Sequence, residues 1–196
     1  MTDGFFGRHL KRTIPALALV GVFSLISPAL ASDHQERCEA GGKAFKALKV
    51  NDTAEVPPEI AFSTADGGEK TLAEFAGRGV VVNFWATWCA PCVREMPELD
   101  HIKNELAPAG IDVIAVSMDR GGHKAVGDFY ERLKIKNLES LVASAKDGST
   151  LKIRGLPTTL LIDPRGREVA RIVGLFKYDQ PESIEFLKRC IGPRGS

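Results

Sequence analysis

The chain has 196 residues, of which 44% are hydrophobic and 26% are charged, and its formal net charge is +1. This composition is that of a folded globular protein and excludes a low-complexity or disordered chain. The near-neutral charge argues against nucleic acid as the main partner, because phosphate binding needs a concentrated positive field. The length allows one ordinary domain with an additional terminal segment.

The N-terminal stretch has the pattern of an export segment. Basic residues within positions 8–12 precede an uncharged apolar stretch from Ile14 to Ile26, and Pro28 is followed by the small side chains of residues 29–31. This order favours a cleaved signal peptide over residues 1–31, although the stretch is also long enough for an N-terminal membrane anchor. Both alternatives place the rest of the chain outside the cytoplasm, and we expect the periplasm or cell envelope, where disulfides persist.

The remaining sequence predicts a short N-terminal extension and one α/β domain. Residues 32–54 are polar with a weak helical pattern, and the domain is expected over residues 55–192. It starts with a β-hairpin around Asp66-Gly67-Gly68, and short apolar runs then alternate with helical spacings before a terminal hairpin. Beyond the first hairpin, strands are expected over Val80–Trp85, Ile111–Ser117, Leu141–Ala143, Thr158–Ile162 and Glu168–Val173, and helices over Ala90–Leu106, about 126–133 and about 181–191.

Cys89 and Cys92 form a C-x-x-C motif, which can be half of a zinc site, a structural disulfide or a redox-active pair. A zinc site needs four ligands, and the sequence offers no second C-x-x-C and no histidines at ligand spacing. The predicted position favours redox chemistry, because Cys89 follows a buried strand and starts a helix whose unpaired N–H groups and dipole stabilise a thiolate. Pro91 suits the first helical turn.

The two cysteines are expected to differ in accessibility. Cys92 lies one turn into the helix, where we expect Trp85, Trp88 and the helix itself to shield it. Cys89 is therefore the expected nucleophile, and Cys92 is the expected resolving thiol, which does not compete for substrate.

Three separated segments resemble the TlpA/ResA family of thioredoxin-like proteins, in the same order. They are residues 66–75 (DGGEKTLAEF), 82–97 (VNFWATWCAPCVREMP) and 155–166 (GLPTTLLIDPRG), and the resemblance covers about residues 55–190. It implies a thioredoxin-like fold with a central mixed sheet flanked by helices, an N-terminal β-hairpin and a central insertion. It also implies a thiol–disulfide oxidoreductase that uses no metal and no cofactor.

The resemblance also implies roles for residues around the cysteines. Pro157 would be a cis-proline facing the pair, and Leu156 would present its backbone to a substrate strand, with Trp88 and Pro91 completing the substrate-binding surface. Without the resemblance, the sequence would predict an ordinary trans proline at position 157, at the start of a strand.

Glu95 matches a glutamate that the family places near the active-site thiols. A half-buried carboxylate there would have a raised pKa and could exchange the thiol proton. The alternative is a solvated helix residue that pairs with a neighbour such as Arg94.

The sequence departs from related proteins at two positions. Thioredoxin has a buried aspartate where this chain has Asn83, which leaves Glu95 as the candidate for handling the proton. Cytochrome c maturation thioredoxins of the CcmG type usually have a glutamate directly after the cis-proline, and here Thr158 takes that place. This favours a TlpA-like reductase without excluding cytochrome c maturation.

Two other functions remain open. A peroxiredoxin-like peroxidase would share the hairpin and first strands, but its P-x-x-x-T-x-x-C pattern is incomplete around Thr87. A copper-binding assembly factor would use Cys89 and Cys92 as soft ligands.

The absence of a histidine between Cys89 and Cys92 favours a reductase over an oxidase, because a strong oxidase needs an unusually acidic thiolate. The family suggests apocytochrome c thiols or the copper-site cysteines of oxidase assembly proteins as substrates. It also suggests a membrane electron donor of DsbD or CcdA type, and we expect a monomer.

Cys38 and Cys190 are isolated in the sequence. Cys190 lies on the expected inner face of the last helix and could be a buried free thiol. An even number of cysteines in an oxidising compartment instead favours a structural Cys38–Cys190 disulfide. Some TlpA-type proteins carry a second pair with one member before the core, as Cys38 is.

Overall fold

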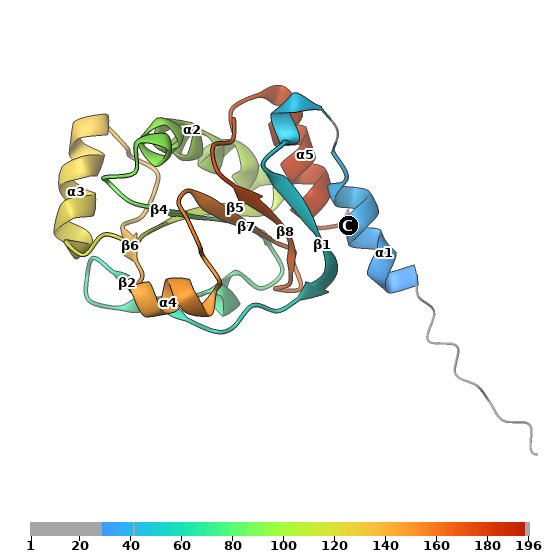
Figure 1. The fold of residues 1–196 in the computed structure, drawn as a ribbon, viewed down its shortest axis with the longest axis horizontal. Helices are drawn as coiled ribbons and strands as arrows, with labels where there is room; N and C mark the ends of the chain where they lie inside the picture. The colour runs from blue at the N-terminus through green and yellow to red at the C-terminus, as the bar shows by residue number, and fades with distance from the viewer. Residues whose placement is uncertain (1–28, 41, 195–196) are drawn as a thin grey trace, which may run out of the picture.

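The computed structural model describes residues 29–40 and 42–194. Its strands form one mixed sheet in the order β1-β8-β7-β4-β5-β6-β2-β3 (Figure 1). Near the middle, β4 runs parallel to β5 and antiparallel to β7, while β2 and β3 form the predicted hairpin at one edge. The strands are β1 (Leu48–Glu55), β2 (Ala61–Thr64), β3 (Glu69–Thr71), β4 (Gly79–Trp85), β5 (Ile111–Ser117), β6 (Leu141–Val142), β7 (Thr158–Ile162) and β8 (Glu168–Val173).

Helices flank this sheet, as the sequence predicts. One face is covered by α2, α3 and α5, and α4 lies on the other face (Figure 1). The segment between β5 and β7 contains α3, β6 and α4. The α-helices are α1 (Ala29–Cys38), α2 (Ala90–Leu106), α3 (Gly122–Leu133), α4 (Ala145–Thr150) and α5 (Pro181–Ile191), and short 3-10 helices span Lys43–Phe45, Leu72–Phe75 and Ala107–Ala109.

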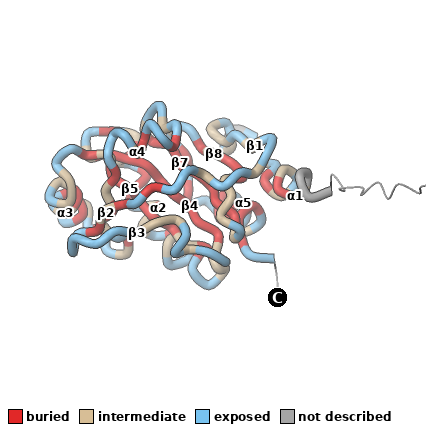
Figure 2. The backbone as a smooth tube through the Cα atoms, turned by 90° about the horizontal axis from the view of Figure 1, so that it is seen from below, coloured by how far each residue is buried: buried red, intermediate tan, exposed pale blue. Residues whose placement is uncertain are grey.

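The central strand β4 is buried along its whole length, as Figure 2 shows for the middle of the sheet. Alternate side chains of a strand point to opposite faces. Val81 and Trp85 therefore join the core beneath α2 and α5, whereas Val80, Val82 and Phe84 join the smaller core on the α4 face. Burial on both faces explains why the sequence of β4 is an almost continuous apolar run.

The helix α2 starts at the carboxyl end of β4, after a short loop. Cys89 is its N-cap residue, and Pro91 lies in the first turn, where its missing N–H leaves no donor unpaired. The helix continues through Pro97, and its bounds are those that the sequence predicts. Its buried side consists of Cys92, Glu95, Met96, Leu99, Ile102 and Leu106.

The structure corrects the domain boundary drawn at residue 55. Residues 48–55 form β1, which pairs with β8 in an antiparallel arrangement from Leu48↔Ile172 to Glu55↔Glu168. The expected extension therefore supplies an edge strand of the sheet. An edge strand is half solvated, and β1 therefore contains charged residues such as Lys49 and Asp52. These residues weaken the alternation of apolar and polar side chains by which a strand is predicted from sequence.

The predicted export segment lies outside the described residues except for residues 29–31, which begin α1. Within residues 29–40 and 42–194, no helix has the length and apolar character needed to span a membrane.

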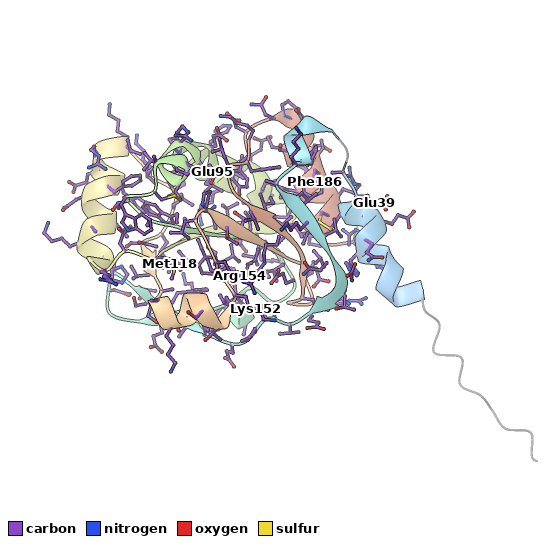
Figure 3. All side chains as sticks on the ribbon, viewed as in Figure 1. Glu39, Glu95, Met118, Lys152, Arg154 and Phe186 are labelled. Atoms are coloured by element: carbon purple, nitrogen blue, oxygen red, sulfur yellow. A yellow bond between two sulfur atoms is a disulfide. The ribbon has the colours of Figure 1, made fainter. Side chains whose placement is uncertain are left out.

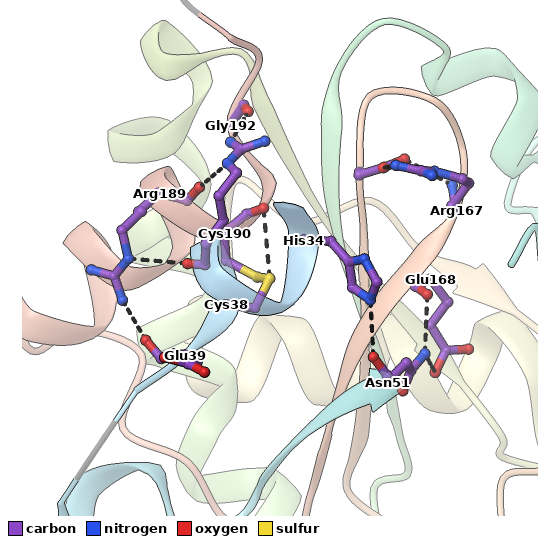
Figure 4. Close-up of a disulfide and its surroundings, with 11 residues drawn as sticks. His34, Cys38, Glu39, Asn51, Arg167, Glu168, Arg189, Cys190 and Gly192 are labelled. Carbon is purple, nitrogen blue, oxygen red and sulfur yellow. Dashed lines mark hydrogen bonds and ion pairs between the residues drawn. A yellow bond between two sulfur atoms is a disulfide. The ribbon is translucent and has the colours of Figure 1, made fainter. Parts of the chain in front are cut away.

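A disulfide between Cys38 and Cys190 joins the end of α1 to α5 across a sequence separation of 152 (Figure 4). Both cysteines are buried. On either side of the bond, Arg37 donates a hydrogen bond to the carbonyl of Arg189 (2.9 Å), and Arg189 donates one to the carbonyl of Arg37 (3.0 Å). Cys190 is thus not a free thiol, and the two ends of the described chain are fixed to each other.

Candidate active site

The Cys89–Cys92 disulfide lies at the N-terminus of α2, with an S–S distance of 2.05 Å and a Cα–Cα distance of 5.2 Å. Cys89 is 6% exposed and Cys92 is 0% exposed. The backbone N–H of Cys92, in the first turn of the helix, donates a hydrogen bond to Cys89 Sγ over 3.3 Å. The same donor and the helix dipole stabilise a thiolate on Cys89 once the bond is reduced.

The loop before Cys89 is anchored by Asp119, a buried residue just beyond the end of β5. The Asp119 carboxylate accepts hydrogen bonds from the backbone N–H of Thr87 (2.8 Å), from the Thr87 hydroxyl (2.7 Å) and from the Ser117 hydroxyl (2.8 Å). Sequence reasoning missed this residue. The sequence could have indicated it, because Asp119 lies two residues after a buried strand, and parallel neighbours such as β4 and β5 end at the same edge of the sheet.

The two tryptophans differ in exposure. Trp85 is fully buried and stacks on Tyr130 with ring centroids 5.9 Å apart. Trp88 is 71% exposed, so the prediction that it shields Cys92 is wrong. The exposed Trp88 side chain borders an open hollow of about 460 Å³ that also includes residues 118–121.

The peptide bond between Leu156 and Pro157 is cis. Thr158 lies opposite Phe84 in the β4–β7 pair, so Pro157 lies at the same end of the sheet as the cysteine loop. The Thr158 hydroxyl donates to the carbonyl of Gly155 over 2.7 Å, and the residue is buried. Where CcmG-type proteins usually have a glutamate, this chain therefore uses an uncharged residue that stabilises the turn.

Glu95 lies on α2 above the sheet (Figure 3) and is only 1% exposed. Its Oε1 accepts a hydrogen bond from the backbone N–H of Phe176, over 2.5 Å. The pKa of Glu95 is raised to about 8, mainly by burial and also by the nearby Glu98 carboxylate. The solvated alternative, in which Glu95 pairs with Arg94 on the surface, is wrong because the loop around Phe176 covers the carboxyl group.

Other expected site residues surround this arrangement. Pro91 and Leu156 are partly exposed, and Leu156 packs against the buried cluster that contains both Cys89 and Cys92. Asn83 is buried on β4, and its Nδ2 donates to the Thr159 hydroxyl over 2.9 Å. Among residues 29–40 and 42–194, no group of three or more histidine, cysteine, aspartate or glutamate side chains is arranged to hold a metal ion.

A C-x-x-C disulfide at a helix N-terminus, a cis-proline at the same end of a mixed sheet and a buried glutamate define a thioredoxin-fold thiol–disulfide oxidoreductase. The model of the Redoxin family matches residues 49–185. The chain is also 35% identical over 185 residues to the thiol-disulfide oxidoreductase ResA of Bacillus thuringiensis subsp. konkukian, which covers 93% of this chain and 96% of the relative. The chain belongs to the Redoxin family, among its ResA-like thiol–disulfide oxidoreductases.

Solved structures agree with the fold. A thiol:disulfide interchange protein from Bacteroides sp. is 30% identical with a TM-score of 0.53, covering 61% of this chain and 80% of that chain. The pneumococcal exposed lipoprotein thioredoxin Etrx1 from Streptococcus pneumoniae is 26% identical with a TM-score of 0.54, covering 67% of this chain and 98% of that chain. The thioredoxin-like fold that the resemblance implies is therefore confirmed.

Proposed function

We propose that this oxidoreductase is exported and reduces protein disulfides in the cell envelope. The observation that carries the proposal is the environment of the redox pair. Cys89 keeps some exposure beside a helix N-terminus, whereas Cys92 and Glu95 are buried one and two turns further along the same helix. A thiol that reaches substrate, a second thiol that does not, and a group able to exchange a proton are the parts that disulfide reduction needs.

In the proposed reaction, the Cys89 thiolate of the reduced protein attacks one sulfur of a substrate disulfide. A bond forms between Cys89 Sγ and that sulfur, the substrate S–S bond breaks, and the other substrate sulfur leaves as a thiolate that takes up a proton. Cys92 Sγ then attacks Cys89 Sγ, so that the Cys89–Cys92 disulfide forms and the second substrate sulfur leaves and is protonated. The substrate gains two electrons, and the two protein thiols lose them.

Glu95 is the proposed proton partner of Cys92. Cys92 must lose its thiol proton in the second step, and Glu95 lies three residues further on, on the same side of α2. The Glu95 pKa of about 8 is close to that of an ordinary thiol, about 8.5. Proton transfer between groups of matched pKa costs little free energy, so Glu95 can accept the proton and return it when the disulfide is reduced again.

The proposed docking surface lies around the cis-proline. Trp88 is exposed, and the backbone of Leu156 precedes Pro157 at the same end of the sheet. The N–H of Gly174 donates to the carbonyl of Pro157 over 2.9 Å. This bond places the exposed side chains on either side of Gly174 next to the proline, and they are Val173 (44% exposed) and Leu175 (43% exposed). An extended, partly apolar substrate segment suits this surface.

The reducing direction follows from the surroundings of Cys89. The dipeptide Ala90-Pro91 supplies no charge that would add to the stabilisation of the thiolate by the helix N-terminus. A reducing couple in an oxidising compartment needs a supply of electrons. We therefore propose a membrane donor of DsbD or CcdA type, and apocytochrome c or copper-site cysteines as substrates.

Trapping of substrates tests the proposal. In a Cys92→Ser variant of the reduced protein, the mixed disulfide on Cys89 cannot be resolved, so envelope proteins with disulfides should accumulate in covalent complexes that a reductant releases. The matched control is Cys89→Ser, which should trap nothing. If Cys89→Ser traps as much as Cys92→Ser, or neither variant traps any protein, the proposal is wrong.

A further inference from the structure

A chain of buried polar side chains connects the sheet to the loop that covers Glu95. Asn83 on β4 and Thr159 on β7 are direct cross-strand neighbours, and Asn83 Nδ2 donates to Thr159 Oγ1 over 2.9 Å. Thr159 Oγ1 in turn lies 2.6 Å from the hydroxyl of Tyr178, which belongs to the loop between β8 and α5. Each of the three residues is at most 1% exposed. Polar groups buried this deeply cost free energy unless every donor finds an acceptor.

Two acceptors of this cluster have no partner. Glu95 Oε2 and Asn83 Oδ1 are both buried, and neither is hydrogen-bonded to any described residue. The Asn83 amide is close enough to the Glu95 carboxyl group to lower its pKa, although no direct hydrogen bond joins the two side chains as they are placed. Both acceptors, one on each of these two side chains, gain a partner if a proton lies between the carboxyl group and the amide.

A neutral Glu95 supplies that proton. With the proton on Oε2, the carboxyl group donates to Asn83 Oδ1, Asn83 Nδ2 donates to Thr159 Oγ1, and the Thr159 hydroxyl donates to Tyr178 Oη. All hydrogen bonds then run in one direction, from Glu95 toward Tyr178, and both unpaired acceptors are satisfied.

When Glu95 is ionised, the same groups can form hydrogen bonds that run in the opposite direction, from Tyr178 toward Glu95. Half a turn of the Asn83 amide about its Cβ–Cγ bond exchanges Oδ1 and Nδ2, atoms of nearly the same size. Asn83 Nδ2 then donates to the Glu95 carboxylate, the Thr159 hydroxyl donates to Asn83 Oδ1, and the Tyr178 hydroxyl donates to Thr159 Oγ1. This arrangement again satisfies both of the acceptors that lack a partner.

We propose that Asn83, Thr159 and Tyr178 form a reversible hydrogen-bond chain that serves both protonation states of Glu95, and that the Asn83 amide turns over when the Glu95 proton leaves or returns. The three are positioning residues, because they act through Glu95 and not on the sulfur atoms. The inference rests on the proposed role of Glu95 in thiol proton transfer. It explains how a carboxyl group sealed from water can change its charge while Glu95 Oε2 and Asn83 Oδ1 keep a hydrogen-bond partner in both states.

The other charged groups around Glu95 do not replace this chain. Glu98, on the same helix, raises the pKa of Glu95, and Lys177, on the covering loop, lowers it. Burial raises the pKa of Tyr178, so its hydroxyl keeps its proton. Asn83 and Thr159, which β4 and β7 contribute, do not ionise, and Cys89 and Cys92 do not titrate while they form the disulfide.

Titration of Glu95 in the oxidised protein, followed by ¹³C NMR of labelled glutamate carboxyl carbons, tests the chain without any turnover. The Glu95 signal is assigned by its loss in Glu95→Gln. Asn83→Leu removes a donor to the carboxylate and an acceptor for the acid, and hydrogen bonds to a charged group are the stronger, so the Glu95 pKa should rise by about one unit.

Tyr178→Phe should shift the same pKa less. Without the phenol, the chain loses one hydrogen bond in either state, from Thr159 to Tyr178 when Glu95 is neutral and from Tyr178 to Thr159 when Glu95 is ionised. The two losses largely cancel, so the Glu95 pKa should move by less than in Asn83→Leu. Tyr130→Phe, which removes the hydroxyl of a buried tyrosine stacked on Trp85, is the matched control and should leave the Glu95 pKa unchanged.

A second readout uses the unmodified protein and does not depend on any variant folding. The Asn83 side-chain N–H protons should show proximity to Thr159 below the Glu95 pKa and to the Glu95 carboxyl side above it, with the change centred on that pKa. One amide orientation throughout the titration, or an unchanged Glu95 pKa in Asn83→Leu, would overturn the proposal. Because the trapping experiment depends on Cys89 and Cys92 alone, its failure and the failure of this titration are distinguishable.

Discussion

The molecule contains two disulfides in opposite environments. Cys89 and Cys92 are three residues apart at a helix N-terminus, next to an exposed tryptophan and a buried carboxyl group. Cys38 and Cys190 are 152 residues apart and almost fully buried, and the neighbouring arginines donate only to backbone carbonyls. The first pair keeps some exposure and has Glu95 as its proposed proton partner, and the second pair has neither. The surroundings of a disulfide, more than the bond itself, decide whether it reacts or holds the chain together.

Removing the nucleophile should have the largest effect. Cys89→Ser should lower the rate of reduction of a protein disulfide by on the order of a thousandfold or more, because the remaining thiol of the motif, Cys92, is fully buried. Cys38→Ser should leave most of this rate intact. Steady-state reduction of a model protein disulfide checks both, and comparable losses in the two variants would erase the distinction between the pairs.

Removing the second disulfide should instead reduce stability. The double variant Cys38→Ser/Cys190→Ser no longer constrains a long loop in the unfolded chain, and the free energy of unfolding should fall by about 3–5 kcal/mol. Denaturant unfolding of the oxidised proteins measures this change. The variant should still react through Cys89, so a stable but inactive variant would show that the clamp between α1 and α5 has a catalytic role.

Glu95→Gln should change how stability depends on pH. The folded-state pKa of Glu95, about 8, is raised above its ordinary value of 4.5, so between these two values the folded protein holds a proton that the unfolded chain releases. Stability of the oxidised wild-type protein should therefore fall as the pH rises from about 4.5 to 8, by about 2–4 kcal/mol in total.

The Gln variant lacks this ionisation. Its free energy of unfolding should therefore fall less between pH 5 and pH 9 than that of the wild-type protein. Urea unfolding at both pH values gives the comparison. Glu105→Gln changes an exposed carboxyl group near the end of the same helix and should keep the wild-type dependence. A wild-type stability that does not change over this range would show that Glu95 is ionised throughout.

The smallest effect is expected from the anchor of the active-site loop. Asp119→Asn replaces charged acceptors for the Thr87 N–H and hydroxyl, so unfolding should become easier by about 1–2 kcal/mol, and alkylation of Cys89 in the reduced protein should slow severalfold. Asp128→Asn, at an exposed position on α3, should do neither. Unaltered alkylation in Asp119→Asn would mean that the loop holds its position without this carboxylate.

Local signals predicted much of this site from the sequence. The bounds of α2 follow from Pro91 in the first turn and from apolar side chains at helical spacing, such as Met96 and Leu99. Both signals lie within the helix itself. The C-x-x-C motif needed only its own neighbours, and the cis bond before Pro157 was accessible only through the resemblance, because few X-Pro bonds in folded proteins are cis.

What the sequence did not predict depends on contacts between distant segments. The burial of Glu95 requires the loop at Phe176, which lies 81 residues away, and the role of Asp119 requires the parallel pairing of β4 with β5. Neither leaves a periodic pattern in the local sequence. The exposure of Trp88 was missed for the same reason, since apolar character alone does not show on which side of a loop a side chain lies.

The reduction midpoint of each pair tests the central claim most directly. The oxidised protein is equilibrated in glutathione and dithiothreitol buffers of known potential, quenched by alkylation and mapped by mass spectrometry, which reports both pairs in one sample. The account predicts a midpoint for Cys89–Cys92 below about −230 mV, with Cys38–Cys190 still oxidised where the first pair is fully reduced. A Cys89–Cys92 midpoint near −120 mV, roughly that of enzymes that introduce disulfides, would contradict the proposed reductase, as would reduction of Cys38–Cys190 first.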